Sequence, residues 1–352
     1  MERSAIRGSL GLLLCAGLLL AIPALAATQA DRDACAASAE KSDIAEACNR
    51  IINDASEQAA ERAKAYNNRG VAHFGLHDYD AALADHAAAI KIDPRDKWGF
   101  ARRGMAWTEK GEFDRAIADL TEAVTIDPEY AFGFGQRAQA HARKRLITKK
   151  GGWEPAIADY TVAIKLDPDL LWLYSSRGVA YSNNRQYNLA VEDCSEVIKR
   201  APENFAGYNC RGVAYEGLRD FGRAIADYDQ SISLNPKNGV AYWNRGNARR
   251  LTGRIDEAIA DYDQAIAINP KDFNAFNSRG KVFAAKGNRD RAIADFTRAI
   301  ELGPTYVEAY NNRGLSQEVL GRRAEAVADF RKAQSIDPVD PVSKELLRRY
   351  RF

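Results

Sequence analysis

Residues 241–270 read AYWNRGNARRLTGRIDEAIADYDQAIAINP, and variants of this segment recur along the 352-residue chain. With Gly246 as a marker, a small residue returns every 34 positions, except across one gap of 40. An aromatic residue precedes each marker by four positions, as Tyr242 does, and an alanine follows it by twelve, as Ala258 does. A proline follows by 24, as Pro270 does; in the third repeat the alanine and the proline come six positions later. Eight repeats therefore cover residues 63–340, at 63–96, 97–130, 131–170, 171–204, 205–238, 239–272, 273–306 and 307–340.

Each repeat predicts a helical hairpin. Two amphipathic segments of roughly 12 to 14 residues, with apolar positions three and four apart, are joined by polar turns such as GRID at 253–256. The closing proline stops the second helix. One hairpin cannot bury both of its faces, but stacked hairpins can. The sequence therefore predicts an all-α protein, a right-handed α-solenoid of stacked helix-turn-helix hairpins.

The repeat resembles the tetratricopeptide repeat family in its period, its small, aromatic and alanine positions, and its closing proline. The resemblance covers residues 63–340. The sequence departs from the family pattern in two ways. It has arginine before the glycine, where the family usually has leucine, and its third repeat has six extra residues. The resemblance implies a non-catalytic scaffold for protein–protein or protein–peptide interaction, in which the first helices line a concave groove.

The arginine before each marker raises the question of whether it binds a phosphate or serves the fold. An aspartate follows it by 16 residues, or by 22 in the third repeat, so the two charges repeat in step on the two helices of a hairpin. A phosphate-binding arginine would not need a carboxylate in step with it. We therefore predict eight structural ion pairs: Arg69–Asp85, Arg103–Asp119, Arg137–Asp159, Arg177–Asp193, Arg211–Asp227, Arg245–Asp261, Arg279–Asp295 and Arg313–Asp329.

Candidate groove residues lie on the first helix of each repeat. Three consecutive repeats place an aromatic residue six positions before the marker, and polar side chains stand near it. The aromatic stripe has two interpretations: core packed beneath the preceding repeat, or a hot-spot strip for an extended peptide. Asparagines two or three positions before the marker could pair with a peptide backbone. The candidate set is Trp98, Arg102, Phe132, Gln136, Trp172, Asn209, Asn244, Asn277 and Asn312.

The segments outside the repeats indicate export. Residues 1–26 carry Arg3 and Arg7, then an apolar run and a small-residue exit, as a secretory signal peptide does. Residues 27–62 are expected to form a helical segment and 341–352 a capping helix. We expect a periplasmic protein of a bacterium or a secreted protein. No later stretch has the apolar length of a membrane span.

Four cysteines remain once Cys15 leaves with the signal peptide. Cys35 and Cys48, 13 positions apart, are expected to form a disulfide, because export makes disulfides possible and the segment can fold back on itself. Cys194 and Cys210 fall in adjacent helices; small buried side chains without a bridge are the preferred interpretation, and a disulfide between them is the alternative.

No catalytic, cofactor-binding or metal-binding motif is found. His73 and His77 have the i, i+4 spacing of metal ligands, but His73 and His86 occupy positions that hold tyrosine in other repeats, for example Tyr181 and Tyr228. Planar packing residues are therefore the preferred interpretation. The balance of 50 basic and 48 acidic side chains gives no indication of nucleic-acid binding.

A basic stretch in the third repeat supports an alternative function. Residues 143–150 hold Arg143, Lys144, Arg145, Lys149 and Lys150, in what is expected to be a long surface turn. The alternative is binding of an envelope glycan or anionic polymer through this stretch and exposed aromatic side chains. A protein or extended peptide in the groove is the preferred partner.

Overall fold

The structure is a computed structural model, and it describes residues 26–36 and 41–350. The predicted signal peptide, apart from its last residue, lies outside the described residues. Within the described part there are 19 helices and no strand. None of these helices is both long enough and apolar enough to cross a membrane. The chain divides into two compact units, residues 1–110 and 111–352, and each is described separately.

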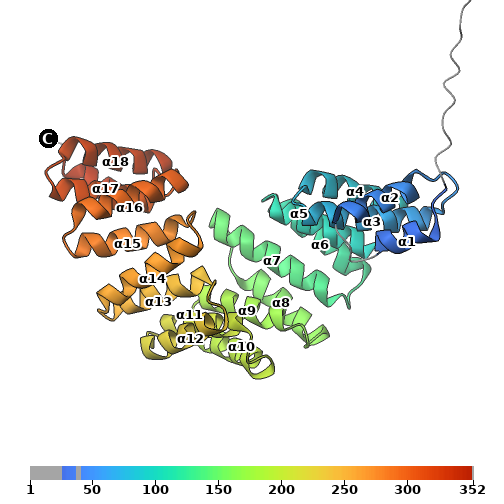
Figure 1. Cartoon of the computed structure of the whole chain (residues 1–352), viewed down its shortest axis with the longest axis horizontal. Helices are drawn as coiled ribbons and strands as arrows, with labels where there is room; N and C mark the ends of the chain where they lie inside the picture. Colours follow the sequence, from blue (N-terminus) through green and yellow to red (C-terminus); the bar gives the residue numbers. More distant parts are fainter. Residues whose placement is uncertain (1–25, 37–40, 351–352) are drawn as a thin grey trace, which may run out of the picture. The chain divides into compact units, whose positions relative to one another are not determined.

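Unit 1 consists of five helices in which neighbours along the chain pack together. Figure 1 shows them at the blue and cyan end of the ribbon. Helices α3 and α4 form the hairpin of the first repeat, and Asp78 caps the start of α4 by accepting a hydrogen bond from the amide of Ala81 at 3.1 Å. The helices are α1 (Gln29–Ala36), α2 (Lys41–Asn53), α3 (Ala59–Gly75), α4 (Tyr79–Ile92) and α5 (Lys97–Glu109).

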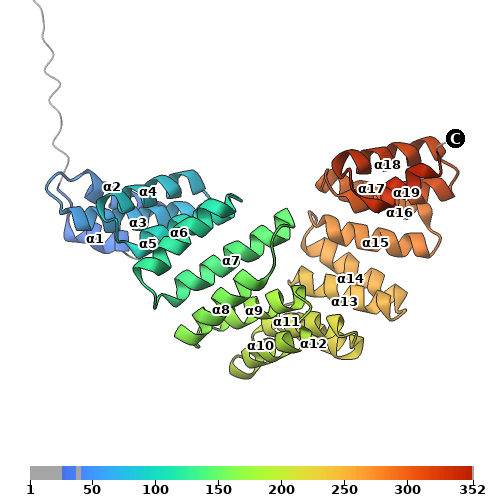
Figure 2. The ribbon, with the colours of Figure 1, turned by 180° about the vertical axis from the view of Figure 1, so that it is seen from behind.

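Unit 2 continues the pattern through six complete hairpins, α7–α8 to α17–α18, with α6 packed on α7. The last helix, α19, packs on α18, where its Leu346 is buried beside Ala326 and Phe330 (Figure 2). The helices are α6 (Phe113–Ile126), α7 (Ala131–Thr148), α8 (Glu154–Leu166), α9 (Leu171–Asn183), α10 (Tyr187–Arg200), α11 (Phe205–Gly217), α12 (Phe221–Leu234), α13 (Gly239–Leu251), α14 (Ile255–Ile268), α15 (Phe273–Ala285), α16 (Arg289–Leu302), α17 (Val307–Val319), α18 (Arg323–Ile336) and α19 (Pro341–Arg348).

The prediction of an all-α solenoid built from stacked hairpins is confirmed within each unit. In every repeat but the third, the turn inside the hairpin has a left-handed residue seven positions after the marker. Glycine supplies it in four repeats, for example Gly253 at φ 79°, whereas Arg219 adopts φ 61° at the equivalent position. The turn therefore forms with or without glycine.

The small marker residue allows an aromatic ring of the second helix to lie flat on the first. A Cβ atom on Gly280 would stand 2.7 Å from Cε1 of Phe296, and Phe296 is fully buried. Other repeats fill the same position, sixteen after the marker, with His86, Cys194 or Tyr228. The distance between the two helices of a hairpin thus depends on the absence of a side chain at the marker.

The six extra residues of the third repeat correct one prediction. They lengthen α7, which reaches Thr148, so Arg143, Lys144 and Arg145 are helical and do not lie in a surface turn. The reason is local: the stretch from 136 to 148 contains no glycine or proline, and Gly151 and Gly152 are the first residues that disfavour a helix.

Among the residues that the structure describes, four cysteines form two disulfides. Cys35 of α1 and Cys48 of α2 are joined, with Cα atoms 4.9 Å apart. Cys194 of α10 and Cys210 of α11 are joined as well, which corrects the expectation of unbridged thiols. Their Cα atoms lie 5.8 Å apart, within the range that a disulfide spans, because both side chains pack over Gly178 where other repeats have an aromatic ring.

The marker glycines give a stability prediction. Gly280→Ala should lower the free energy of unfolding by about 1 kcal/mol or more, because overpacking against Phe296 outweighs the gain in helix propensity of about 1 kcal/mol. Gly222→Ala is the matched control, since Gly222 is exposed in α12 and a Cβ there would meet only Oδ1 of Asp220, at 3.7 Å. It should raise the free energy of unfolding in a urea titration. A stabilising Gly280→Ala would contradict this account.

Candidate functional site

The structure brings together each predicted arginine–aspartate pair whose two members lie in the same unit. In the Arg211–Asp227 pair, Nε and Nη2 of the arginine donate to the two carboxylate oxygens at 2.9 and 2.8 Å. The remaining pair is divided between the units, with Arg103 in α5 and Asp119 in α6. The seven pairs are Arg69–Asp85, Arg137–Asp159, Arg177–Asp193, Arg211–Asp227, Arg245–Asp261, Arg279–Asp295 and Arg313–Asp329.

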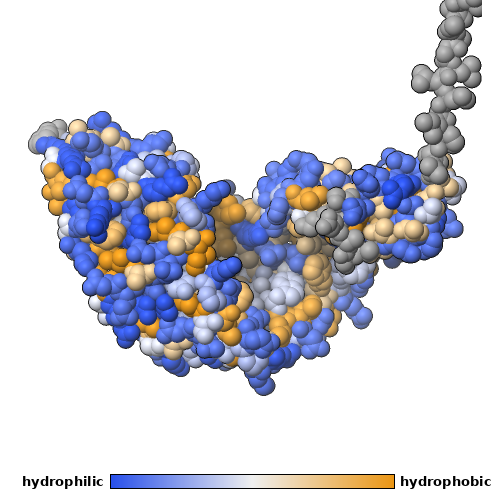
Figure 3. Space-filling model, in the orientation of Figure 1, coloured by the Kyte–Doolittle hydropathy of each residue, from blue (hydrophilic) through white to orange (hydrophobic). Residues whose placement is uncertain are grey.

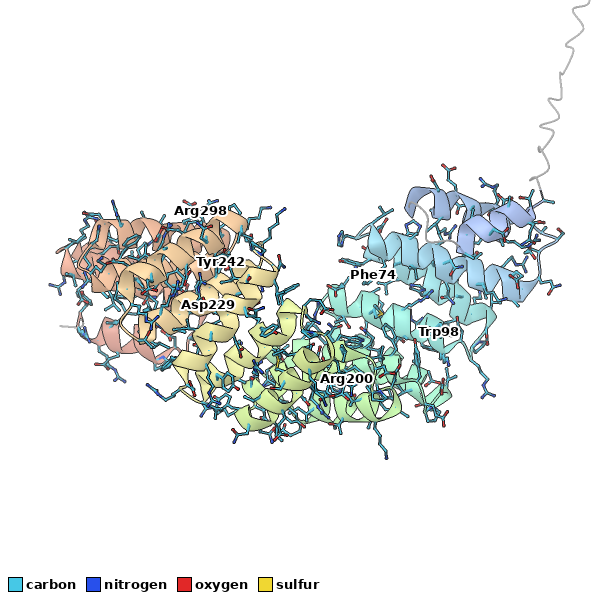
Figure 4. All side chains as sticks on the ribbon, turned by 60° about the horizontal axis from the view of Figure 1, so that its bottom comes forward. Phe74, Trp98, Arg200, Asp229, Tyr242 and Arg298 are labelled. Atoms are coloured by element: carbon cyan, nitrogen blue, oxygen red, sulfur yellow. A yellow bond between two sulfur atoms is a disulfide. The ribbon has the colours of Figure 1, made fainter. Side chains whose placement is uncertain are left out.

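In unit 2 each paired arginine also contacts the preceding hairpin, which the sequence analysis did not predict. Its Nη1 atom donates to a side chain sixteen residues before it, on the preceding second helix. Arg245 binds Asp229 in this way at 2.6 Å, while its guanidinium lies 5.4 Å from the centroid of the Tyr242 ring (Figure 4). The acceptors are Thr121, Thr161, Ser195, Asp229, Asp263 and Thr297.

Through these contacts the guanidinium groups form their hydrogen bonds with other residues of the chain. In the Arg211–Asp227 pair the exposed side-chain fractions are 24% and 8%, so the pair is largely shielded from water. The hydrogen bond to Asp227 raises the pKa of Arg211, although partial burial opposes the shift. A bidentate pair of this kind has a structural role and leaves the arginine little capacity to bind a phosphate.

The pair gives a double-mutant prediction. Arg211→Ala and Asp227→Ala should each lower the free energy of unfolding, because each leaves a charge without its partner, by up to about 3 kcal/mol. The double variant should lose at least about 1 kcal/mol less than the sum of the two. Urea unfolding followed by circular dichroism measures all four proteins, and strictly additive losses would contradict the ion-pair account.

In unit 1 the first helices bound a cavity of about 650 Å³. It contains two of the predicted groove residues, Trp98 and Arg102, both on α5. Trp98 is 48% exposed, so in this unit its side chain is surface and not core (Figure 4). The other lining residues are Ala59, Ala60, Ala63, Lys64, Asn67, Asn68, Ile92, Asp93 and Asp96.

In the wall of this cavity Asn67 of α3 contacts both α4 and the N-cap of α5. Its Nδ2 atom donates to Asp96, and its Oδ1 atom lies 3.0 Å from Nδ1 of His86. His86 is buried against Gly70, and burial, together with the charges of Arg102 and Arg103, lowers its pKa to about 3. His86 is therefore a neutral packing group at neutral pH.

The histidine predicts a pH dependence for unit 1. Between about pH 6.5 and 3 the unfolded chain binds a proton that folded His86 does not, so the free energy of unfolding falls as the pH falls. The slope from this one group is at most about 1.4 kcal/mol per pH unit. The protection factors of the α3 and α4 amides in hydrogen exchange should therefore fall toward acidic pH less steeply in His86→Phe than in the wild type. Equal slopes would show that His86 does not titrate in this way.

The asparagines of unit 2 are paired with one another across repeats. Nδ2 of Asn244 donates to Oδ1 of Asn209 at 3.1 Å, and Nδ2 of Asn312 donates to Oδ1 of Asn277 at 3.0 Å. Asn277 is 2% exposed and also donates to the Tyr306 hydroxyl, so its side chain has almost no surface for a partner. Asn209 and Asn312 are half-buried.

The aromatic stripe continues in unit 2 with two rings in contact. Phe132 and Trp172 meet edge to face with centroids 6.3 Å apart, and both are half-buried. A Cβ atom on Gly135 would stand 2.6 Å from the Trp172 ring, so the indole packs closely on α7. Gln136, one position further along α7, is also half-buried. Trp172 thus contributes to packing while keeping some surface.

Two cavities open between the first helices of unit 2. One, of about 280 Å³, contains the predicted Asn209; we call it the Asn209 cavity, and it is lined by Ala142, Leu146, Trp153, Tyr160, Ser175, Ser176, Val179, Ala180, Ala206, Asn209 and Cys210. The other, of about 360 Å³, contains Asn244; we call it the Glu216 cavity, and it is lined by Ser182, Asn183, Tyr187, Val213, Glu216, Gly217, Trp243, Asn244 and Asn247. The sequence analysis predicted one groove residue in each cavity, Asn209 in the first and Asn244 in the second.

Lys144, His77 and His73, which the sequence analysis considered as binding residues, each contact a neighbouring side chain. Lys144 binds Asp114 at 2.5 Å, so one charge of the basic stretch is already paired. His77 contacts the Tyr79 hydroxyl at 2.9 Å, and Nε2 of His73 lies 3.7 Å from Asp85. In the described part of the chain, no three histidine, cysteine or acidic side chains are grouped so as to hold a metal ion.

Family models agree with the repeat pattern. Models described as tetratricopeptide repeats match residues 63–96, 100–130, 173–204, 205–238 and 277–341, and one described as a TPR repeat matches 246–287. The chain belongs to the tetratricopeptide repeat family. Members of this family are protein-interaction scaffolds, and none of the matching models describes an enzyme. No curated protein matches the sequence.

Solved tetratricopeptide repeat structures share the fold. A tetratricopeptide repeat protein from Parabacteroides merdae is 22% identical with a TM-score of 0.55, over 72% of this chain and 97% of its own. The APC/C hetero-tetramer Cut9–Hcn1 gives 14% identity and a TM-score of 0.59, over 88% of this chain and 60% of that one.

Proposed function

We propose that this protein is an exported, non-catalytic scaffold that holds a protein or extended peptide against the face formed by its first helices. The observation that carries the proposal is the Asn209 cavity. It opens between α7, α9 and α11, and its wall combines apolar side chains with Ser175, Ser176 and Asn209. Such a wall suits a peptide, because an apolar side chain can be buried while the backbone meets polar groups at the rim.

The distribution of apolar residues on the surface supports a local site. In Figure 3 small apolar areas lie between hydrophilic residues on the visible face of unit 2. Val179 is 44% exposed and lines the Asn209 cavity, whereas most exposed apolar residues of unit 2 line neither cavity. Burial of a few such side chains by a partner would supply most of the binding energy.

Export rests on the sequence and on the cysteines. Residues 1–26 have the organisation of a signal peptide, and two disulfides suit an oxidising compartment such as the bacterial periplasm or the exterior. The glycan or anionic-polymer alternative is less well supported, because Lys144 is paired with Asp114 and Arg145 is half-buried, with its Nε atom inaccessible to solvent.

The proposal predicts that blocking the cavity abolishes capture of a partner. Val179→Arg places a long cation over the Asn209 cavity, while Val162→Arg adds the same charge on α8 at a valine that is 39% exposed and lines neither cavity. The immobilised proteins would be incubated with an envelope extract, and the bound proteins quantified by mass spectrometry. We expect a protein retained by the wild type and by Val162→Arg to fall at least about tenfold with Val179→Arg.

Melting temperatures should stay close to the wild-type value in both variants, since both positions are exposed. Equal capture by both variants would place the partner elsewhere. Retention on insoluble cell wall, with no protein captured, would favour the glycan alternative.

A further inference from the structure

The Glu216 cavity differs in chemistry from the Asn209 cavity. It lies between α9, α11 and α13, and its wall includes three asparagines, one serine, one glutamate and the rings of Tyr187 and Trp243. Tyr187 is held in place by packing on Gly217, where a Cβ atom would stand 2.2 Å from its ring. Trp243 is held by a hydrogen bond from its Nε1 to Oγ of Ser278 at 3.0 Å. Two oriented aromatic rings therefore flank a polar wall.

Glu216 is the charged residue of this wall. Its Oε2 atom accepts a hydrogen bond from the Tyr228 hydroxyl at 3.1 Å, and burial raises its pKa. Among the described residues, no lysine or arginine forms a salt bridge with this carboxylate; Arg250, one repeat further on, influences it only through its charge. The carboxylate is half-buried and lacks a direct cationic partner, which is unfavourable in the free protein.

Ser182 is a second, independent sign of a ligand. Its side chain is 9% exposed, lines the same cavity, and its hydroxyl has no hydrogen-bond partner in the described structure. Buried polar groups are rarely left without a partner, so each such group needs a reason. A ligand with hydrogen-bond donors would satisfy both Ser182 and Glu216.

We propose that the Glu216 cavity binds the cationic side chain of an arginine or lysine of the peptide partner, between Tyr187 and Trp243. The inference rests on the proposed function and adds the chemical class of the ligand. A cation gains from a carboxylate and from aromatic faces at the same time. An uncharged sugar could use the rings and amides and donate hydrogen bonds to the carboxylate, but it would leave the negative charge of Glu216 without a counter-charge.

The Asn209 cavity lies next to the Glu216 cavity, and this predicts the spacing between two residues of the peptide partner. Both cavities lie along α9 and α11: Val179 and Ser182 are three residues apart on α9, and Cys210 and Val213 are three apart on α11. The residues that line the two cavities are centred about five to seven positions apart on these helices, so at about 1.5 Å per helical residue the cavities are displaced by roughly 8–10 Å along α9 and α11. An extended peptide advances about 3.3 Å per residue, so the partner should carry an apolar residue two or three positions from the basic one.

A random dodecapeptide library displayed on phage tests the inference with the disulfide-intact protein. Peptides selected by the wild type should be enriched in arginine or lysine at that spacing from an apolar residue. Glu216→Gln should lose the basic enrichment and keep the apolar one, because glutamine still accepts the Tyr228 hydrogen bond but carries no charge. Glu192→Gln, which removes an exposed carboxylate from α10, is the matched control and should select the same peptides as the wild type.

A synthetic peptide from the selection gives the affinities in solution by fluorescence anisotropy. Replacing its basic residue by glutamine should weaken binding to the unaltered protein by about tenfold or more, and Glu216→Gln should add less than about twofold to that loss. Selected peptides without basic enrichment would overturn this inference and leave the proposed function standing. Failure to select any peptide would overturn both.

Discussion

The stacked hairpins of unit 2 depend on an arginine that is bound from three sides. Its own second helix supplies a carboxylate, the preceding second helix supplies a hydroxyl or a second carboxylate, and an aromatic ring lies three residues before it on the same helix. One planar side chain thus fixes both the hairpin and its contact with the previous hairpin. Arginine suits this role because its donors form a rigid fork that can bind two acceptors at once.

The marker residue imposes a second constraint, at the centre of each hairpin. In the hairpins of Gly70, Gly178, Gly212, Gly246, Gly280 and Gly314, a ring or sulfur atom from the second helix occupies the space that a Cβ atom at the marker would need. Where that group is His86, burial lowers its pKa, which predicts a repeat sensitive to acid; where it is Cys194, a disulfide to Cys210 joins two successive hairpins. The same position therefore gives individual repeats different physical properties without a change of fold.

Positions outside these two constraints are left to form the surface of the first helices. Four residues after the marker the chain places Ser182, Glu216 and Arg250 in three consecutive repeats, although the constraints do not require these residues. The result is a polar cavity beside an apolar one. Chemical diversity along this face is what a scaffold needs in order to distinguish one partner from another.

The sequence alone determined the helical hairpins, their period and the pairing of Arg211 with Asp227, because these depend on spacing within one repeat, where helix geometry fixes the distances. It could not predict that Arg245 also reaches Asp229, that Asn244 bonds to Asn209, or that Cys194 meets Cys210, because these contacts join different hairpins. Nor did it show which first-helix residues surround a cavity. Such contacts depend on how each hairpin is rotated on the last, and many side chains packing together decide that rotation only in the tertiary structure.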